Sequence, residues 1–154
     1  KYSERYARLS IGVAKGIVDK SALEQYSKKG LQIDGTAIAS YAIDYVVPNL
    51  RTLIEKSNKN ISDLSLFLLH QANKTVLKSV ALTMDIDPEK VPFVAQNTGN
   101  TSSAALALAI GESKFVQDNL KEGYVALSAF GVGMNVISLL ADLSNTVVLD
   151  TKYY

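Results

Sequence analysis

The chain has 154 residues, of which 47% are hydrophobic, and a formal net charge of +1. This length suffices for one ordinary globular core, and the charge balance gives no reason to expect a nucleic-acid partner. The absence of cysteine excludes disulfides and thiolate metal sites, and a single histidine argues against zinc, so no metal is expected. No signal peptide and no apolar run of membrane-spanning length is found, which favours a cytoplasmic protein without a membrane partner.

The first thirty residues carry a local excess of basic side chains. Lys1–Gly30 has seven Lys or Arg against three acidic residues, a distribution typical of a solvated face. A short helix is expected over Ser21–Lys29, where Gly30 ends it. We interpret residues 1–31 as an N-terminal arm or connecting segment and residues 32–154 as one domain.

A helical pattern follows from Thr36. Hydrophobic residues recur at three- and four-residue spacing as far as Val46, which predicts an amphipathic helix. Pro48 then removes a backbone donor, so the helix should kink there or a new helix should begin. The polar stretch Lys56–Ser62 predicts a loop.

The most informative stretch is Leu66–Leu69, four consecutive apolar residues followed by His70, the only histidine. Such a run predicts a strand covered on both faces, as in a mainly parallel sheet flanked by helices. Apolar residues from Ala72 to Met84 recur at helical spacing and predict the next helix. His70 should therefore lie at the carboxyl end of a strand, where open α/β sheets bind ligands, and before a helix amino terminus, which disfavours imidazolium.

Two further elements are expected after this helix. Val91–Ala95 predicts a short strand, with Pro92 at its beginning or on an edge. Asn97–Ala104 is a polar turn that presents Asn100 at the start of a helix. Because that helix is apolar on every side over Ala104–Ile110, it should be covered on every side, which one small sheet cannot do.

The last elements are strands. Tyr124–Phe130 and Met134–Leu143 flank a Gly-Val-Gly turn and should form an antiparallel hairpin. Asn145–Asp150 is expected to add a short strand. The whole pattern predicts an α/β fold, a mixed, mostly parallel five-stranded sheet with helices on both faces and a C-terminal antiparallel hairpin.

His70-Gln71-Ala72-Asn73, followed about thirty residues later by Gly99-Asn100-Thr101-Ser102, resembles the C-terminal half of the β-ketoacyl-acyl-carrier-protein synthase III group of thiolase-fold condensing enzymes. Ala129–Gly133 resembles the glycine-rich turn that closes those proteins, and Ile33-Asp34-Gly35 resembles the entry into the same half. The resemblance covers residues 32–143. It implies a thiolase-like half that pairs with a second half in a five-layer body, with the helix at Ala104–Ile110 in the middle layer.

The resemblance also implies roles for individual residues. His70 and Asn100 would be two neutral donors that stabilise the enolate formed when a malonyl thioester loses carbon dioxide. Gln71 receives no chemistry and is interpreted as a linker side chain. The residues implied in binding the substrate or its phosphopantetheine arm are Gly35, Ala72, Asn73, Phe130 and Gly131.

The chain departs from the family pattern in three places. The nucleophilic cysteine of the family lies in the N-terminal half, and this chain has none, so the chain alone is not expected to complete the condensation. Thr75 stands where many members have an arginine that docks the acidic carrier protein. Lys74 and Lys78 could dock it instead, although solvated surface is an equal interpretation. Thr36 replaces an asparagine that several relatives place near the pantetheine.

The predicted function is that of the C-terminal half of a fatty-acid-biosynthesis acyltransferase, which joins an acyl-CoA starter to malonyl-acyl carrier protein by decarboxylative Claisen condensation. Expected partners are acyl-CoA, acyl carrier protein and the N-terminal half, in a homodimer when intact. No bound cofactor is expected, because the substrates arrive as CoA or phosphopantetheine thioesters. The alternatives are a polyketide, hydroxymethylglutaryl-type or head-to-head condensing enzyme, and a non-catalytic half that binds carrier protein or dimerises. A serine hydrolase using His70 is disfavoured, because no Gly-x-Ser-x-Gly motif is present.

Overall fold

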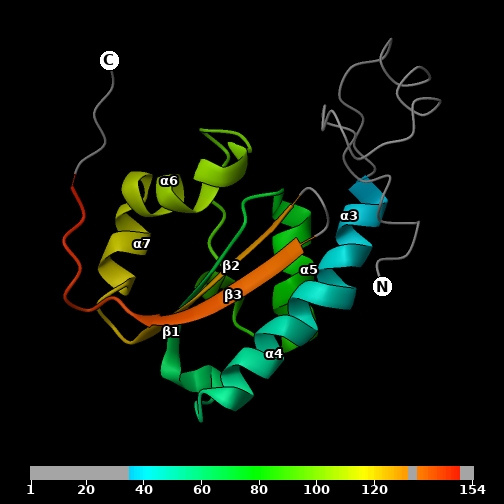
Figure 1. Cartoon of the computed structure of the whole chain (residues 1–154). Coiled ribbons are helices and arrows are strands. Elements are labelled where there is room, and N and C mark those ends of the chain that lie inside the picture. Colours follow the sequence, from blue (N-terminus) through cyan, green and yellow to red (C-terminus); the bar gives the residue numbers. More distant parts are fainter. Residues whose placement is uncertain (1–34, 132–134, 150–154) are drawn as a thin grey trace.

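The computed structural model describes residues 35–131 and 135–149 (Figure 1). The predicted arm over residues 1–31, with its helix at Ser21–Lys29, lies outside these residues. So does most of the Ile33-Asp34-Gly35 entry, together with the centre of the glycine-rich turn at residues 132–134. Within the described part of the chain, no helix is both long enough and apolar enough to cross a membrane.

Helices cover both faces of a central sheet (Figure 1). On one face lie α3 (Gly35–Tyr41), the π-helical turn η1 (Ala42–Val46), α4 (Val47–Lys56) and α5 (Lys74–Met84). On the other face lie α6 (Ala105–Glu112) and α7 (Lys114–Asn119). The strands are β1 (Leu64–Leu69), β2 (Tyr124–Gly131) and β3 (Asn135–Asp142), and short 3₁₀ turns occur at Ile61–Asp63, Pro88–Lys90 and Ser102–Ala104.

The sheet has the order β1-β2-β3, with β1 parallel to β2 and β2 antiparallel to β3. The predicted mixed sheet, its helices on both faces and its C-terminal hairpin are therefore confirmed. The five strands are not found, because the described residues form three. One of the two pairings is antiparallel, so the sheet is also less parallel than the sequence predicted.

The predicted strand at Val91–Ala95 was wrong for a physical reason. Pro92 has no N–H, and the N–H groups of Val94 and Ala95 donate to Gln71 Oε1 at 2.7 and 3.3 Å instead of to a neighbouring strand. A side chain therefore takes the place of a ladder partner, and the segment runs alongside the sheet without joining it.

The predicted strand over Asn145–Asp150 was also wrong over its described residues. Thr146 N–H donates to Leu143 O at 2.9 Å, which closes a turn directly after β3. Val147 and Leu149 are then 81% and 80% exposed. Val148 between them is half-buried against the second core, so the stretch packs at one position without forming a strand within the described part of the chain.

β1 separates two hydrophobic cores, as its uninterrupted apolar sequence predicted. Phe67 and Leu69 pack toward α3, α4 and α5 in the first core, and Leu66 and Leu68 pack toward α6 and α7 in the second. All four side chains are buried because successive residues of a strand point to opposite faces. The strand end that carries His70 is thus held from both sides.

Pro48 marks the junction between two helices, as predicted. The chain widens into one π-helical turn over Ala42–Val46, and α4 then begins at Val47 with Pro48 in its first turn. A proline in a first turn loses no hydrogen bond, because the first N–H groups of a helix have no partner within it. The chain therefore stays helical through the junction.

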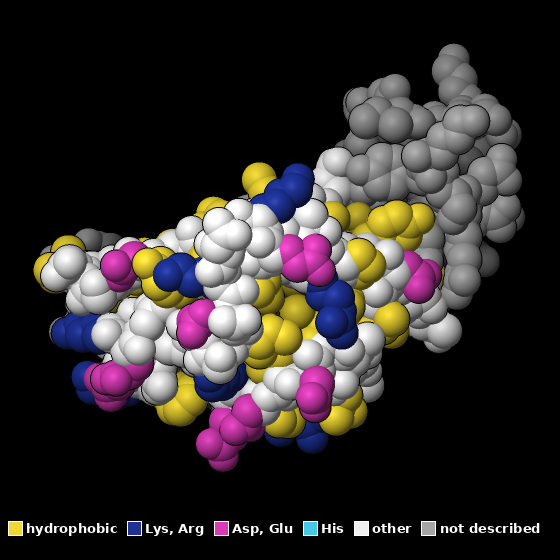
Figure 2. Space-filling model, turned by 90° about the horizontal axis from the view of Figure 1, so that it is seen from below, with side chains coloured by type: hydrophobic (Ala, Val, Ile, Leu, Met, Phe, Trp, Pro, Cys, Tyr) yellow, Lys and Arg dark blue, Asp and Glu magenta, His cyan; other side chains and the backbone are white. Residues whose placement is uncertain are grey.

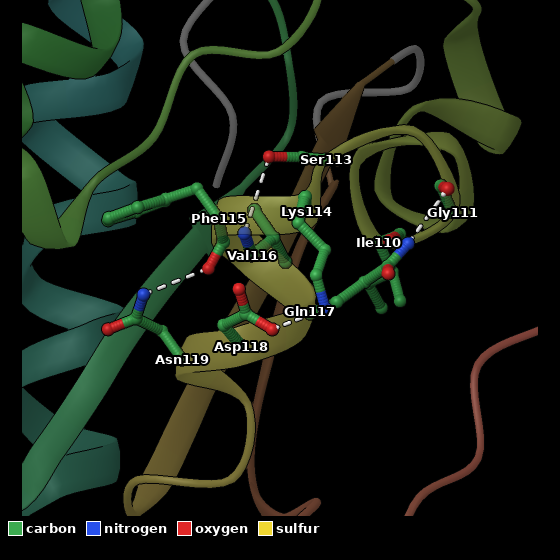
Figure 3. Close-up of polar contacts among 9 residues, drawn as sticks. All are labelled: Ile110, Gly111, Ser113, Lys114, Phe115, Val116, Gln117, Asp118 and Asn119. Carbon is green, nitrogen blue, oxygen red and sulfur yellow. Dashed lines mark hydrogen bonds and ion pairs between the residues drawn. The ribbon is translucent and has the colours of Figure 1, made fainter.

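The single helix expected after Asn100 is divided in two at Ser113 (Figure 3). Ser113 has extended backbone angles, and its Oγ accepts from Val116 N–H at 3.3 Å as the N-cap of α7. Gln117 Nε2 donates to Ile110 O at 3.1 Å and to Gly111 O at 2.9 Å. These bonds satisfy carbonyls that the end of α6 leaves open.

The apolar helix α6 is covered on one side by this chain. Ala105 and Ala109 are buried, and Leu106 and Ile110 pack partly buried against the second core. Ala107 is exposed. Within the described residues the sheet covers only the near side of α6, so the predicted cover on every side is not provided.

Candidate active site

His70 lies directly after β1 and stays in register with β2. Its N–H donates to Ser128 O at 2.8 Å, and its carbonyl accepts from Ala72 N–H at 2.8 Å. The imidazole meets the ring of Phe130 edge-on, with 5.2 Å between ring centroids and an interplanar angle of 77°. Burial lowers the pKa of His70 from its ordinary value of 6.5, so the ring is neutral near pH 7. The sequence predicted this neutrality from the nearby helix start, and the structure adds burial as a cause.

A series of aromatic rings packs next to the imidazole of His70. Phe130 lies 6.2 Å from Tyr41 by ring centroids, and Tyr41 stacks on Tyr45 at 4.8 Å. Tyr41 is fully buried at the end of α3. The ring of His70 therefore packs against Phe130, which in turn contacts Tyr41 at the end of α3. The sequence placed Tyr41 only on a helix face and missed this contribution to the site.

Asn100 lies in a tight turn with its side-chain oxygen already engaged. Gly99 N–H donates to Ala95 O at 2.8 Å, and Gly99 and Ser102 have φ values of 69° and 57°. Asn100 Oδ1 accepts from Ser102 N–H at 2.9 Å, and the residue is exposed. With Oδ1 occupied, the amide group presents its Nδ2 hydrogens as donors.

Gln71 is the residue whose role the sequence analysis missed. It is 2% exposed, and its Nε2 donates to Leu69 O at 2.9 Å and to Pro92 O at 3.3 Å. Its Oε1 accepts from Val94 and Ala95. The available signal was its position, because a polar residue that directly follows an apolar buried strand must satisfy its amide inside the protein.

The implied substrate-binding residues lie at three places. Asn73 is the exposed N-cap of α5, and its Oδ1 accepts from Val76 N–H at 2.9 Å. Ala72 is half-buried just before it. Gly35 opens α3, and Gly131 ends β2, and both are exposed. Asn73 thus has a structural role as a helix cap besides any contact with substrate.

Lys74 and Lys78 are exposed in the first two turns of α5 and border a groove. The groove has a volume of about 380 Å³, and its floor includes Leu77, Phe93 and Phe115. Phe115 is 48% exposed. Cationic side chains beside exposed aromatic surface suit an acidic partner that also has apolar contacts.

The structure brings His70, Gln71 and Phe130 into one cluster at the carboxyl end of the sheet. Asn100 follows in the chain the segment that Gln71 binds. Within the described residues, no hydrogen bond links the side chains of His70 and Asn100. Nor do those residues contain a group of three or more histidine, aspartate or glutamate side chains arranged to hold a metal ion.

The amino end of β1 has a different character. A pocket of about 370 Å³ there is lined by side chains of both signs, including Asp63, Lys90 and Glu122. Lys90 Nζ donates to Leu64 O at 2.7 Å, so this lysine is engaged by the strand end. Figure 2 views the molecule from below and shows acidic and basic side chains interspersed, with no histidine surface. His70 follows the opposite, carboxyl end of β1, so the candidate site lies away from this pocket.

Comparison with known proteins defines the class to which this fold and site belong. The family model for the C-terminal region of 3-oxoacyl-[acyl-carrier-protein] synthase III matches residues 54–143. The β-ketoacyl-[acyl-carrier-protein] synthase III of Trichodesmium erythraeum is 33% identical over 123 residues, which cover 79% of this chain and 37% of that protein.

Two solved structures show the same fold. The 3-oxoacyl-(acyl-carrier protein) synthase of Burkholderia xenovorans matches with a TM-score of 0.76 and 28% identity, over 97% of this chain and 44% of that one. The priming β-ketosynthase of the R1128 polyketide biosynthetic pathway matches with a TM-score of 0.62 and 28% identity, over 76% of this chain and 37% of that one.

The fold and the motifs at its sheet edge are those of a thiolase-fold C-terminal domain. The chain belongs to the 3-oxoacyl-[acyl-carrier-protein] synthase III C-terminal family. It spans about two fifths of the length of the curated relatives it matches.

Proposed function

We propose that this chain is the enolate-stabilising half of a condensing enzyme that joins an acyl-CoA starter to a malonyl thioester carried by acyl carrier protein. The observation that carries the proposal is a neutral histidine at the carboxyl end of β1, together with an asparagine turn that follows the segment bound by Gln71. The half-buried imidazole of His70 follows β1. Asn100 Oδ1 accepts from Ser102 N–H in the turn that follows the segment bound by Gln71. Two neutral donors stabilise a developing oxyanion without having to give up a proton.

The proposed reaction requires one nucleophile, which the second half of the fold would supply. Cleavage of the bond to the malonyl carboxylate releases carbon dioxide and leaves its electron pair on the α-carbon, so negative charge develops on the thioester oxygen. The ring N–H of His70 and the Nδ2 hydrogens of Asn100 donate to that oxygen. The cysteine first takes the starter acyl group from acyl-CoA and releases CoA. The carbanion then attacks this acyl group, the carbon–carbon bond forms and the cysteine thiolate leaves.

The second half would cover surface that this chain leaves open. The outer side of α6 is apolar, with Ala107 exposed. Ile137 and Leu139 on β3 are 69% and 49% exposed. Apolar surface on a helix and on a strand is what a large, permanent interface buries.

The test of this assignment is the gene sequence upstream of the codon for Lys1. We expect the reading frame, or an adjacent one, to encode a second half of this fold with a cysteine at a strand-to-helix turn. A start codon immediately upstream, without a cysteine-bearing half encoded nearby, would contradict the condensing role and favour a half-domain that only binds carrier protein or dimerises.

The similarity to a polyketide priming ketosynthase favours a second candidate with the same chemistry and a different starter. Such an enzyme would use the same His70 and Asn100 pair, because the enolate is common to both reactions. Product analysis with acetyl-CoA and with longer acyl-CoA starters distinguishes the two. Exclusive use of the longer starters would contradict the fatty-acid assignment.

Lys74 and Lys78 are proposed to dock the carrier protein, because both are exposed beside the groove on α5. Reversing both charges with Lys74→Glu and Lys78→Glu should raise the KM for malonyl-acyl carrier protein about tenfold, since each such charge pair contributes up to about 1 kcal/mol. The KM for malonyl-CoA should be unchanged. Lys121→Glu, an exposed lysine before β2, is the matched control, and an equal effect on both substrates would contradict docking.

A further inference from the structure

We propose that Gln71 is a positioning residue that fixes Asn100 relative to His70. The inference rests on the proposed function, because it assumes that these two side chains act on one oxygen. It goes beyond the interpretation of Gln71 as a linker. The carboxamide of Gln71 is the element that ties the end of β1 to the segment leading to Asn100.

The contacts of Gln71 use the whole amide. Nε2 donates two hydrogen bonds, to Leu69 O and Pro92 O, and Oε1 accepts two, from Val94 N–H and Ala95 N–H. A primary amide has two donor hydrogens and two acceptor lone pairs, so each one is paired. The side chain is 2% exposed, and water cannot easily replace a lost partner.

Among the residues that the structure describes, the segment bound by Gln71 has no strand partner. Pro92–Ala95 lies outside the sheet ladder, and its backbone donors at positions 94 and 95 are taken by Gln71. The four hydrogen bonds span 2 to 24 positions in the sequence. The side chain of Gln71 therefore accepts the backbone hydrogen bonds that a neighbouring strand would accept in a sheet.

Hydrogen bonds lead from Gln71 to Gly99, the residue directly before Asn100. Gln71 Oε1 accepts from Ala95 N–H, and Ala95 O accepts from Gly99 N–H. The turn then continues to Asn100, whose Oδ1 accepts from Ser102 N–H. On the other side, the backbone of His70 is fixed to Ser128 O of β2. The hydrogen bonds of Gln71 therefore connect the end of β1, which carries His70, with the segment that leads to Asn100.

The expected effect follows from the sensitivity of catalysis to geometry. A displacement of about 1 Å can cost up to about a hundredfold in rate. Gln71→Met preserves the approximate volume of the side chain and removes all four hydrogen bonds. We expect it to lower kcat for malonyl-CoA decarboxylation by the intact enzyme about tenfold, with little change in KM.

The experiment is a double-mutant cycle that combines Gln71→Met with Asn100→Ala in the intact enzyme. If Gln71 acts through Asn100, Gln71→Met should cost less than about twofold once Asn100 is already alanine, because there is no longer an amide to misplace. Gln117→Met is the matched control, since Gln117 also donates to two backbone carbonyls but at the α6–α7 corner (Figure 3). It should change kcat less than about twofold.

Three outcomes separate this inference from the proposed function. If Gln71→Met lowers kcat equally in the wild-type and Asn100→Ala backgrounds, or if Gln117→Met has the same effect, the positioning role is overturned. If Asn100→Ala and His70→Ala leave decarboxylation intact, the proposed function itself fails. Should Gln71→Met not fold, Gln71→Glu keeps an acceptor for positions 94 and 95, and the same comparison with Asn100→Ala then decides the question.

Discussion

Replacing His70 or Asn100 with alanine is expected to reduce decarboxylation of a malonyl thioester by the intact enzyme about a hundredfold or more. The reason is that each side chain donates to the enolate oxygen, and removing one such donor typically costs about 3 kcal/mol of transition-state stabilisation. The loss should appear in kcat more than in KM, because charge develops on that oxygen only as the carboxylate leaves.

The measurement is release of labelled carbon dioxide from malonyl-CoA, with folding of each variant checked by circular dichroism. Asn97→Ala is the matched control, because Asn97 is another exposed asparagine of the same turn, and it should retain full activity. Undiminished decarboxylation by either His70→Ala or Asn100→Ala would refute the role of that residue.

The pH dependence gives a second readout of the same prediction. Burial lowers the pKa of His70 below its ordinary value of 6.5, so the neutral ring persists as the pH falls through that value. Decarboxylation should therefore hold at pH 6.5 and decline only as the pH passes the lowered pKa and the ring gains a proton. An acidic limb centred at or above pH 6.5 would contradict this assignment of the catalytic histidine.

Replacing Phe67 with alanine is expected to lower the free energy of unfolding by about 3–5 kcal/mol. Phe67 is fully buried in the middle of β1, where it is paired with Ala126 of β2 and packs into the first core. Its removal leaves a cavity between the sheet and the helical layer. A loss of this size is a large part of the 5–15 kcal/mol that stabilises a typical domain.

Urea unfolding followed by circular dichroism measures this change. Leu82→Ala is the matched control, because Leu82 is a large apolar residue on α5 that is 74% exposed. Its substitution should change the free energy of unfolding by about 0.5 kcal/mol or less. A loss below about 1 kcal/mol for Phe67→Ala would mean that β1 is not the centre of the core.

Local pattern was enough to predict the elements whose burial is set by their own sequence. The apolar run Leu66–Leu69 predicted a strand covered on both faces, and the structure confirms it. The spacing from Ala72 to Met84 predicted α5, and the glycines after Phe130 predicted the hairpin of β2 and β3. Periodicity reports which faces of an element are buried, so these predictions needed no knowledge of distant residues.

The candidate site was predicted in part for the same reason. The position of His70 at a strand end follows from the run that precedes it, and the position of Asn100 follows from the polar turn before α6. The two motifs indicated the proposed chemistry, but neither motif predicts which residues hold the side chains of His70 and Asn100 in place. The aromatic support from Tyr41 through Phe130 joins residues that are far apart in the sequence.

By itself, the sequence determined the class of fold, the buried strand and the residues at its end. Only the tertiary structure decided which groups accept hydrogen bonds from the backbone N–H groups. The segment Val91–Ala95 looked like a strand, yet Gln71 takes its N–H groups from more than twenty positions away. Likewise, Ser113 divides one expected helix into α6 and α7. An apolar pattern favours burial of a segment, but its hydrogen-bond partners depend on the three-dimensional packing of distant residues, which no local pattern contains.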